Sequence, residues 1–273
     1  MKTSNIILIY DDLCPLCVWY TGLFVKYKLL RPENRVAFSS APSEVLGLID
    51  FEKAKDEIPL IDTESKKVFY GFDALINILG SFVPLIEKTG KLKVINWTFK
   101  KIYKFVSFNR KVVVAKKCGP GDIDCSPSFS IKYRLLLLIM SFITGMLVLP
   151  VIHKSLQSLL PFYTASYKQL FLSSLMLAAI TYTACSFLNF RKAIEYLGQH
   201  AMLALLLIML LLPILLIQKL AIWIVVPYLI AITVVLIKEY IRRMRFVDRF
   251  SNQRATITIN SISSLIFVFN LFI

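Results

Sequence analysis

The stretch "NIILIYDDLCPLCVWYTGLFVKYKLL" (residues 5–30) decides how the first part of this chain folds. Its β-branched run at 5–10 predicts a buried strand, and the apolar residues at helical spacing that follow predict a helix. Pro15 suits the first turn of that helix, where a backbone N–H is not needed. Cys14 and Cys17 therefore fall at the junction between a strand and the helix that follows it.

Further along the chain, the same kind of reading predicts an alternation of strands and helices. The predicted elements are a strand at 35–40, a loop with a short helix at 41–57, a strand, turn and strand at 58–71, and a helix at 71–80. The resulting order β-α-β-α-β-β-α is that of the thioredoxin fold. The sequence therefore predicts an α/β, thioredoxin-like N-terminal domain over residues 1–117, followed by a juxtamembrane linker at 118–133.

The rest of the chain, 134–273, is dominated by Leu, Ile and Val, and the whole sequence is 57% hydrophobic. A membrane span needs about 20 apolar residues. The block 201–237 would be about 55 Å long as one helix, too long for a single span, so we expect a hairpin that turns at Gln218 and Lys219. The fold prediction here is an all-α transmembrane domain of about five helices. The predicted spans are 134–153, 169–188, 200–217, 220–238 and 256–273.

The formal net charge of +15 is distributed in a way that predicts the orientation in the membrane. Segment 238–255 holds six Lys or Arg and 189–199 holds two, whereas the turn at 218–219 holds only Lys219. By the positive-inside rule, the two basic segments and the N-terminal domain face the cytoplasm, and the C-terminus lies outside. We expect an integral protein of a bacterial inner membrane whose basic surface meets lipid headgroups. No nucleic-acid partner is expected, because no binding motif accompanies the charge.

Three motifs resemble the DCC family of thiol-disulfide oxidoreductases: "YDDLCPLC" (10–17), "IPLIDTESKKVFYGFDALINIL" (58–79) and "IYKFVSFNRKVV" (102–113). The family's Asp-x-x-Cys-x-x-Cys signature is matched by Asp11, Cys14 and Cys17. The resemblance covers roughly residues 5–115, and it implies a thioredoxin-like fold and thiol-disulfide exchange. The family usually has Gly after the Asp, and this chain has Asp12, whose carboxylate we expect to raise the pKa of the cysteines.

The position of the two cysteines indicates their roles. The helix dipole and free backbone N–H groups stabilise a thiolate at the helix start, which makes Cys14 the expected exposed nucleophile and Cys17 the more buried resolving thiol. Asp11 could accept a proton from Cys17, or it could simply cap the helix. The substrate would be a disulfide-containing protein or a small thiol, and no cofactor is expected.

The bond between Ile58 and Pro59 opens the third predicted strand. Thioredoxin-like proteins carry a cis-proline there that faces the Cys-x-x-Cys motif, so we assign substrate binding to both residues. Because cis is the minority form of such bonds in general, the sequence leaves the isomer open.

Other interpretations of the cysteines remain. Cys14 and Cys17 could be two inert buried thiols, or half of a Cys₄ zinc site completed by Cys118 and Cys125. The C-x₆-C spacing of the second pair is unusual for zinc, and we predict no metal. Cys118 and Cys125 could also be a second thiol pair, although we prefer a plain loop. The main alternative function is a non-enzymatic membrane protein whose N-terminal domain binds a partner or zinc.

Overall fold

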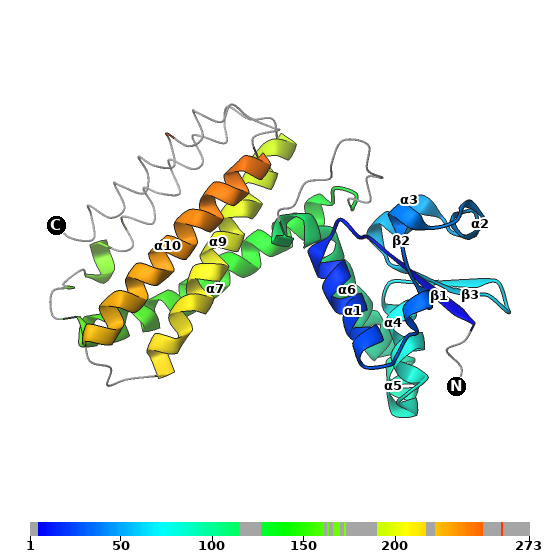
Figure 1. The fold of residues 1–273 in the computed structure, drawn as a ribbon. Coiled ribbons are helices and arrows are strands. Elements are labelled where there is room, and N and C mark those ends of the chain that lie inside the picture. The colour runs from blue at the N-terminus through cyan, green and yellow to red at the C-terminus, as the bar shows by residue number, and fades with distance from the viewer. Residues whose placement is uncertain are drawn as a thin grey trace. The chain divides into compact units, whose positions relative to one another are not determined.

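The structure is a computed structural model, which describes residues 5–114, 127–160, 163, 166–169, 172, 190–216, 222–247 and 258 (Figure 1). The chain divides into two compact units, the first ending at Tyr133 and the second beginning at Arg134. Each unit is described by itself.

The first unit is built on a four-stranded mixed sheet with the order β2-β1-β3-β4. β1 pairs in parallel with β2, with Ile9 opposite Val36, and in antiparallel with β3, with Ile7 opposite Ile61. β3 and β4 are also antiparallel. The strands are β1 (Ile6–Tyr10), β2 (Arg35–Ala37), β3 (Pro59–Asp62) and β4 (Lys67–Tyr70).

Helices join these strands in the order expected from the sequence, with some differences. The predicted strand at 35–40 stops at Ala37, because the chain turns into the 3-10 helix η2 (Phe38–Ser40), and segment 41–57 holds two short helices instead of one. Helices α5 and α6 were not predicted. The helices are α1 (Pro15–Lys26), η1 (Pro32–Asn34), α2 (Ser43–Leu46), α3 (Phe51–Asp56), α4 (Phe72–Gly80), α5 (Pro84–Gly90) and α6 (Lys93–Val114).

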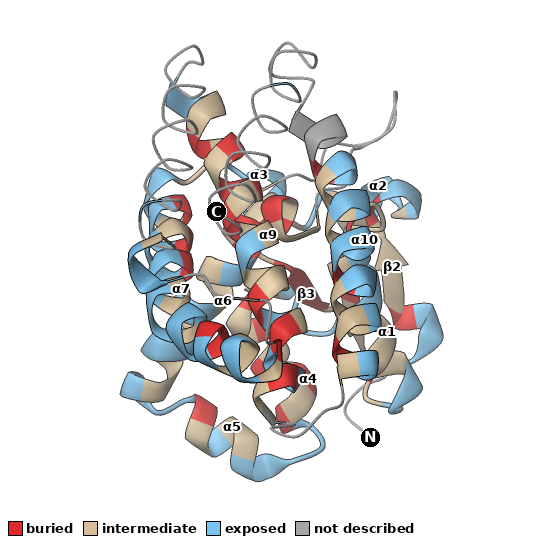
Figure 2. Ribbon diagram, turned by 90° about the vertical axis from the view of Figure 1, so that its left-hand side faces the viewer, coloured by how far each residue is buried: buried red, intermediate tan, exposed pale blue. Residues whose placement is uncertain are grey.

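Apolar side chains cover both faces of the sheet. Leu8 and Ile9 are adjacent in β1 and fully buried, and since side chains alternate along a strand they belong to opposite faces. Leu8 packs with residues of α1, α4 and α6, and Ile9 packs with residues of α2 and α3. The middle of β3 and the inner side of α4 are accordingly buried (Figure 2). The sheet is therefore a central layer that holds the start of α1 in place.

Among the residues that the structure describes, three helices are long and apolar enough to cross a membrane, and the second unit holds all of them except the first turn of α7: α7 (Ile131–Leu159), α9 (Phe190–Leu216) and α10 (Ile222–Val247). They include the predicted span 134–153 and the described parts of two others, 200–216 and 222–238, and the hairpin turn predicted at Gln218 and Lys219 lies outside the described residues. The other two predicted spans, 169–188 and 256–273, lie almost wholly outside the described residues.

The helices of the second unit are longer than predicted. Segment 189–199, expected to be a loop, forms the first turns of α9 from Phe190 onward, and α10 continues through the first half of the predicted loop 238–255. Likewise, α7 starts at Ile131, inside the predicted linker. The expectations were wrong here because hydropathy marks only the apolar part of a helix, whereas charged turns can extend it on either side.

Ion pairs and hydrogen bonds bring three helix ends of this unit together. Arg134, near the start of α7, lies 3.0 Å from the Glu195 carboxylate in the second turn of α9. Arg243, near the end of α10, donates to the side-chain carbonyl of Gln199 at 2.7 Å. The first turns of α7 and α9 and the last turns of α10 therefore lie at one end of the unit.

Candidate functional site

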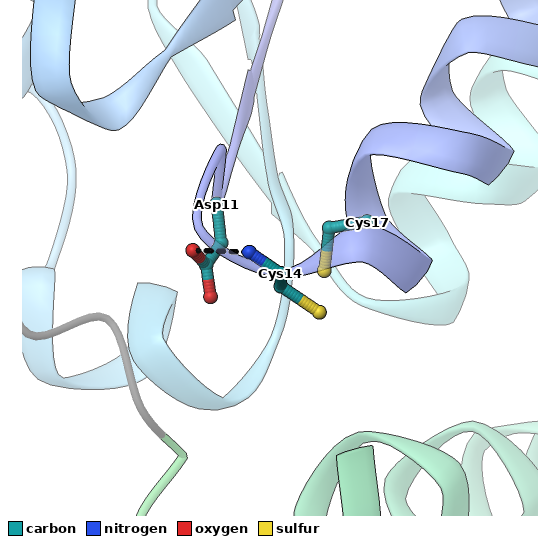
Figure 3. A group of neighbouring side chains, drawn as sticks. All are labelled: Asp11, Cys14 and Cys17. Atoms are coloured by element: carbon teal, nitrogen blue, oxygen red, sulfur yellow. Dashed lines mark hydrogen bonds between the residues drawn. The ribbon is translucent and has the colours of Figure 1, made fainter. Parts of the chain in front are cut away.

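The two cysteines stand where β1 passes into α1. Cys14 is the N-cap residue, with φ −95° and ψ 106°, and its carbonyl accepts the first helical hydrogen bond from Val18 at 3.0 Å. Pro15 is the first helical residue, as predicted. Cys17 follows one turn behind Cys14, and the two sulfur atoms lie side by side (Figure 3).

Asp11 shapes the turn between the strand and the helix. Its Oδ1 accepts the backbone N–H of Leu13 at 3.0 Å. The same oxygen accepts the backbone N–H of Cys14 at 3.1 Å (Figure 3). These hydrogen bonds fit the capping interpretation of Asp11. Burial raises the pKa of the Asp11 carboxyl, opposed by the nearby Arg110 and by the two N–H groups. Its role as proton acceptor for Cys17 stays a prediction.

Arg110 is the site residue that the sequence did not predict. It lies on α6, which packs beside α1 (Figure 1). Its Nη2 lies 3.3 Å from Asp11 Oδ2 and donates to the Lys55 carbonyl at 2.8 Å. The Arg110 side chain is only 8% exposed and that of Asp11 11%, so this is a buried ion pair between residues 99 positions apart. The one signal in the sequence was the polar series Tyr103, Ser107 and Arg110 at helical spacing.

The surroundings shift the pKa values of the two thiols in opposite directions. The pKa of Cys14 falls to about 6, chiefly because Cys17 donates its S–H to the Cys14 sulfur; burial opposes the fall, and the Cys17 N–H and the Arg110 charge assist it. The same hydrogen bond, together with burial, raises the pKa of Cys17 far above its usual value. Cys14 is therefore the thiolate of the pair and Cys17 the thiol that stabilises it.

Access to the pair is narrow. The whole Cys14 residue is 8% exposed and Cys17 is 4% exposed, so the expectation of an exposed Cys14 was wrong. Cys14 instead lines a cavity of about 30 Å³. This volume holds about one or two water molecules. The other lining residues are Leu13, Pro15, Arg110, Lys111, Val114 and Pro127.

Asp12 makes a structural contact that the sequence did not reveal. Its carboxylate accepts the hydroxyl of Ser39 at 2.7 Å and the backbone N–H of Ser39 at 3.4 Å, so it fastens the turn to η2, directly after β2. The Asp11 carboxylate opposes ionisation of Cys14. The extra acid in the motif is thus explained by a local structural contact.

Ile58 and Pro59 lie where the third strand begins, and both are buried. The Ile58 N–H donates to the Tyr103 hydroxyl at 2.9 Å, and Pro59 stands opposite Tyr70 in the sheet. No peptide bond among the described residues is cis, so the Ile58–Pro59 bond is trans. Substrate binding by these two residues stays a prediction.

Asp11, Cys14 and Cys17 could together also bind a metal ion. Ligand atoms of Asp11, Cys14 and Cys17 lie within 4.8 Å of one another. Zinc prefers four ligands, and the Asp11 carboxylate is already engaged with Arg110 and two N–H groups. Cys118 and Cys125, predicted as a second pair or as further ligands, lie outside the described residues.

No protein-family model, curated protein or solved structure matches this chain. The resemblance to the DCC family therefore rests on the sequence motifs. What the chain does has to be argued from the geometry of Asp11, Cys14, Cys17 and Arg110.

Proposed function

We propose that this chain is a membrane-attached thiol-disulfide oxidoreductase whose reactive pair is Cys14 and Cys17. The observation that carries the proposal is the asymmetry of two adjacent thiols at a helix start, one with a lowered and one with a raised pKa. With a pKa of about 6, Cys14 is about nine-tenths thiolate at pH 7, and the thiolate is the nucleophile in disulfide exchange. Two inert buried thiols would both be expected to have raised pKa values.

The reaction follows from these positions. The Cys14 thiolate attacks one sulfur of a substrate disulfide, a mixed disulfide forms, and the other substrate sulfur leaves as a thiolate. Cys17 then loses its proton, attacks Cys14 Sγ and releases the second substrate sulfur. Two electrons pass to the substrate, which is reduced to two thiols, while Cys14 and Cys17 become a disulfide. Asp11 is the nearby base for the Cys17 proton, and Arg110 offsets the negative charge of the site.

A thioredoxin-like fold for the first unit belongs to the same proposal. The strand order β2-β1-β3-β4, with β1 and β2 parallel and the other neighbours antiparallel, supports it. So do the helices on both faces of the sheet and the cysteines at the start of α1. Together with the motifs, these features favour membership of the DCC family.

We also propose that the pair works in the cytoplasm. Cations of the first turns of α7 and α9 and of the last turns of α10 gather at one end of the second unit. The positive-inside rule assigns such an end to the cytoplasmic face. In a reducing compartment the expected substrates are disulfides of proteins or small thiols, which the pair would reduce.

The full-length protein in detergent allows a direct test. After equilibration in dithiol-disulfide buffers of graded potential, free thiols are alkylated and mapped by mass spectrometry. We expect a reversible Cys14–Cys17 disulfide with a single midpoint, and a mixed disulfide on Cys14 in the Cys17→Ser variant. Absence of both would refute the proposal.

The proximity of Asp11, Cys14 and Cys17 favours zinc binding as a second candidate function. In that case, the protein would carry about one zinc ion per chain. Cys14→Ser would abolish this binding, and the reversible disulfide would be missing from the native protein.

A further inference from the structure

Helix α6 turns a polar face toward the rest of the first unit. Lys100 pairs with Asp73 at 2.7 Å, the Tyr103 hydroxyl accepts from Ile58, and Arg110 pairs with Asp11. All three lie on one face of the helix, because they follow each other at intervals of three and seven residues. Asn96 and Ser107 belong to the same face and bond to the carbonyls of Gly90 and Asp56.

Over the first half of α6, the opposite face is apolar and exposed. Val94 is 76% exposed, Trp97 63% and Ile102 50%. A helix on the surface of a soluble domain normally buries its apolar stripe and exposes its polar one. In α6 this arrangement is reversed, which indicates that the apolar stripe has a partner outside the first unit. We call Val94, Trp97, Thr98, Lys101 and Ile102, with Lys93 at their edge, the outer α6 face.

The charge of α6 indicates the chemistry of that partner. Its 22 residues include six Lys or Arg and no Asp or Glu. Three of these cations are paired with acids of the first unit: Lys100 with Asp73, Lys104 with Glu57, and Arg110 with Asp11. Lys93 and Lys101 have no ion pair in the part of the chain that the structure describes, and Lys101 lies 5.8 Å from the centre of the Trp97 ring. The outer α6 face is thus apolar, aromatic and cationic.

We propose that the outer α6 face binds the surface of an anionic lipid bilayer. Helices with an apolar stripe flanked by Lys lie in the headgroup region, where Trp is favoured and Lys meets lipid phosphates. The chain itself holds this face near a membrane. Sixteen residues, 115–130, separate α6 from α7, a helix long enough to span. The start of α7 is held against the first unit, because the Tyr133 ring stacks on that of Phe108 in α6 at 5.0 Å and the Ser128 hydroxyl donates to the Asp56 carboxylate at 2.8 Å. An acidic and apolar protein surface is the competing partner.

Tryptophan fluorescence of the full chain in lipid nanodiscs tests this proposal, which does not depend on the redox function. The variant Trp19→Phe/Trp223→Phe keeps only Trp97. The variant Trp97→Phe/Trp223→Phe keeps only Trp19, which is equally exposed at 63% but lies on α1, so it is the matched control. The probe is a nanodisc of phosphatidylglycerol with brominated acyl chains, compared with one of brominated phosphatidylcholine.

We expect bromine to quench Trp97 at least about twofold more than Trp19 in the anionic discs. The variant Lys93→Gln/Lys101→Gln in the Trp97 background should lower this quenching to the level seen with phosphatidylcholine. Equal quenching of Trp97 and Trp19, or no dependence on headgroup charge, would overturn the proposal. The proposal would also be overturned if Trp97 were protected from a water-soluble quencher and yet not quenched by the brominated lipid, because that result indicates a protein partner.

Discussion

Removing the charge of Arg110 should weaken the nucleophile without touching either cysteine. The guanidinium is one of the influences that lower the pKa of Cys14 to about 6, behind the hydrogen bond from Cys17. A nearby opposite charge shifts a pKa by about 1–3. Because Arg110 is one of the lesser influences on Cys14, we expect Arg110→Met to raise the pKa of Cys14 by about 1. At pH 6 the thiolate fraction of Cys14 would then fall from about one-half to about one-tenth. Alkylation of Cys14 should slow about fivefold at pH 6 and stay nearly unchanged at pH 9.

Arg110→Met also removes one partner of the buried ion pair, in which Arg110 and Asp11 lie 3.3 Å apart and are nearly inaccessible to water. Leaving one partner of such a pair alone costs about 3–5 kcal/mol of folding free energy. Arg110→Lys keeps the charge and is the matched control for the pKa. The double variant Asp11→Asn/Arg110→Met removes both charges and should regain much of the stability.

The assay is the alkylation rate of Cys14 across pH, read by mass spectrometry, on protein whose circular dichroism matches the native chain. If Arg110→Met and the native protein give the same pH profile, Arg110 does not stabilise the thiolate and the reasoning fails.

Four further predictions follow from the same contacts. Cys17→Ala removes the hydrogen bond that does most to lower the pKa of Cys14, so that pKa should rise from about 6 toward 9 in a thiolate absorbance titration; an unchanged value would contradict the assignment. Asp12→Gly should leave the Cys14 pKa unchanged, since Asp12 binds Ser39, and a fall would show that its charge reaches the site. Because folding lowers the pKa of Cys14, the ionised thiolate stabilises the reduced protein fully above pH 9, and this stabilisation is lost as the pH falls through about 6. The difference in unfolding temperature between the native protein and Cys14→Ser should therefore shrink as the pH is lowered from 9 to 6. A constant difference would contradict this. In intact cells, a membrane-impermeant thiol reagent should label Ser158→Cys at once and Ser251→Cys only after permeabilisation, and the opposite pattern would reverse the orientation.

The sequence predicted the features that depend on neighbouring residues. The strand at 5–10, the helix after Cys14 and the apolar helices at 134–153 and 222–238 all follow from local runs of side chains, and the structure has them. The second strand was predicted too long because Phe38 is an aromatic residue of the kind that strands favour. In the structure, Phe38 belongs to the 3-10 helix η2, and its side chain is buried there.

Features that depend on distant contacts were not predicted. An amphipathic pattern is normally interpreted with its apolar side inward, which would turn Trp97 into the core and Arg110 into solvent. The structure has the reverse, because Asp11, Glu57 and Asp73 supply partners for the cations of α6. None of these acids lies near α6 in the sequence, so no local pattern reveals the pairing.

The Asp11–Arg110 pair also has a consequence for synthesis of the chain. A ribosome adds about 5–20 residues per second, so Arg110 emerges about 5–20 s after Asp11. Until then, burial of the Asp11 carboxylate lacks its compensating charge, and we expect the turn before α1 to stay hydrated. The nascent cysteines would meanwhile behave more like ordinary thiols. Asp11 and both cysteines thus lie within the first 17 residues, yet their buried form waits for residue 110.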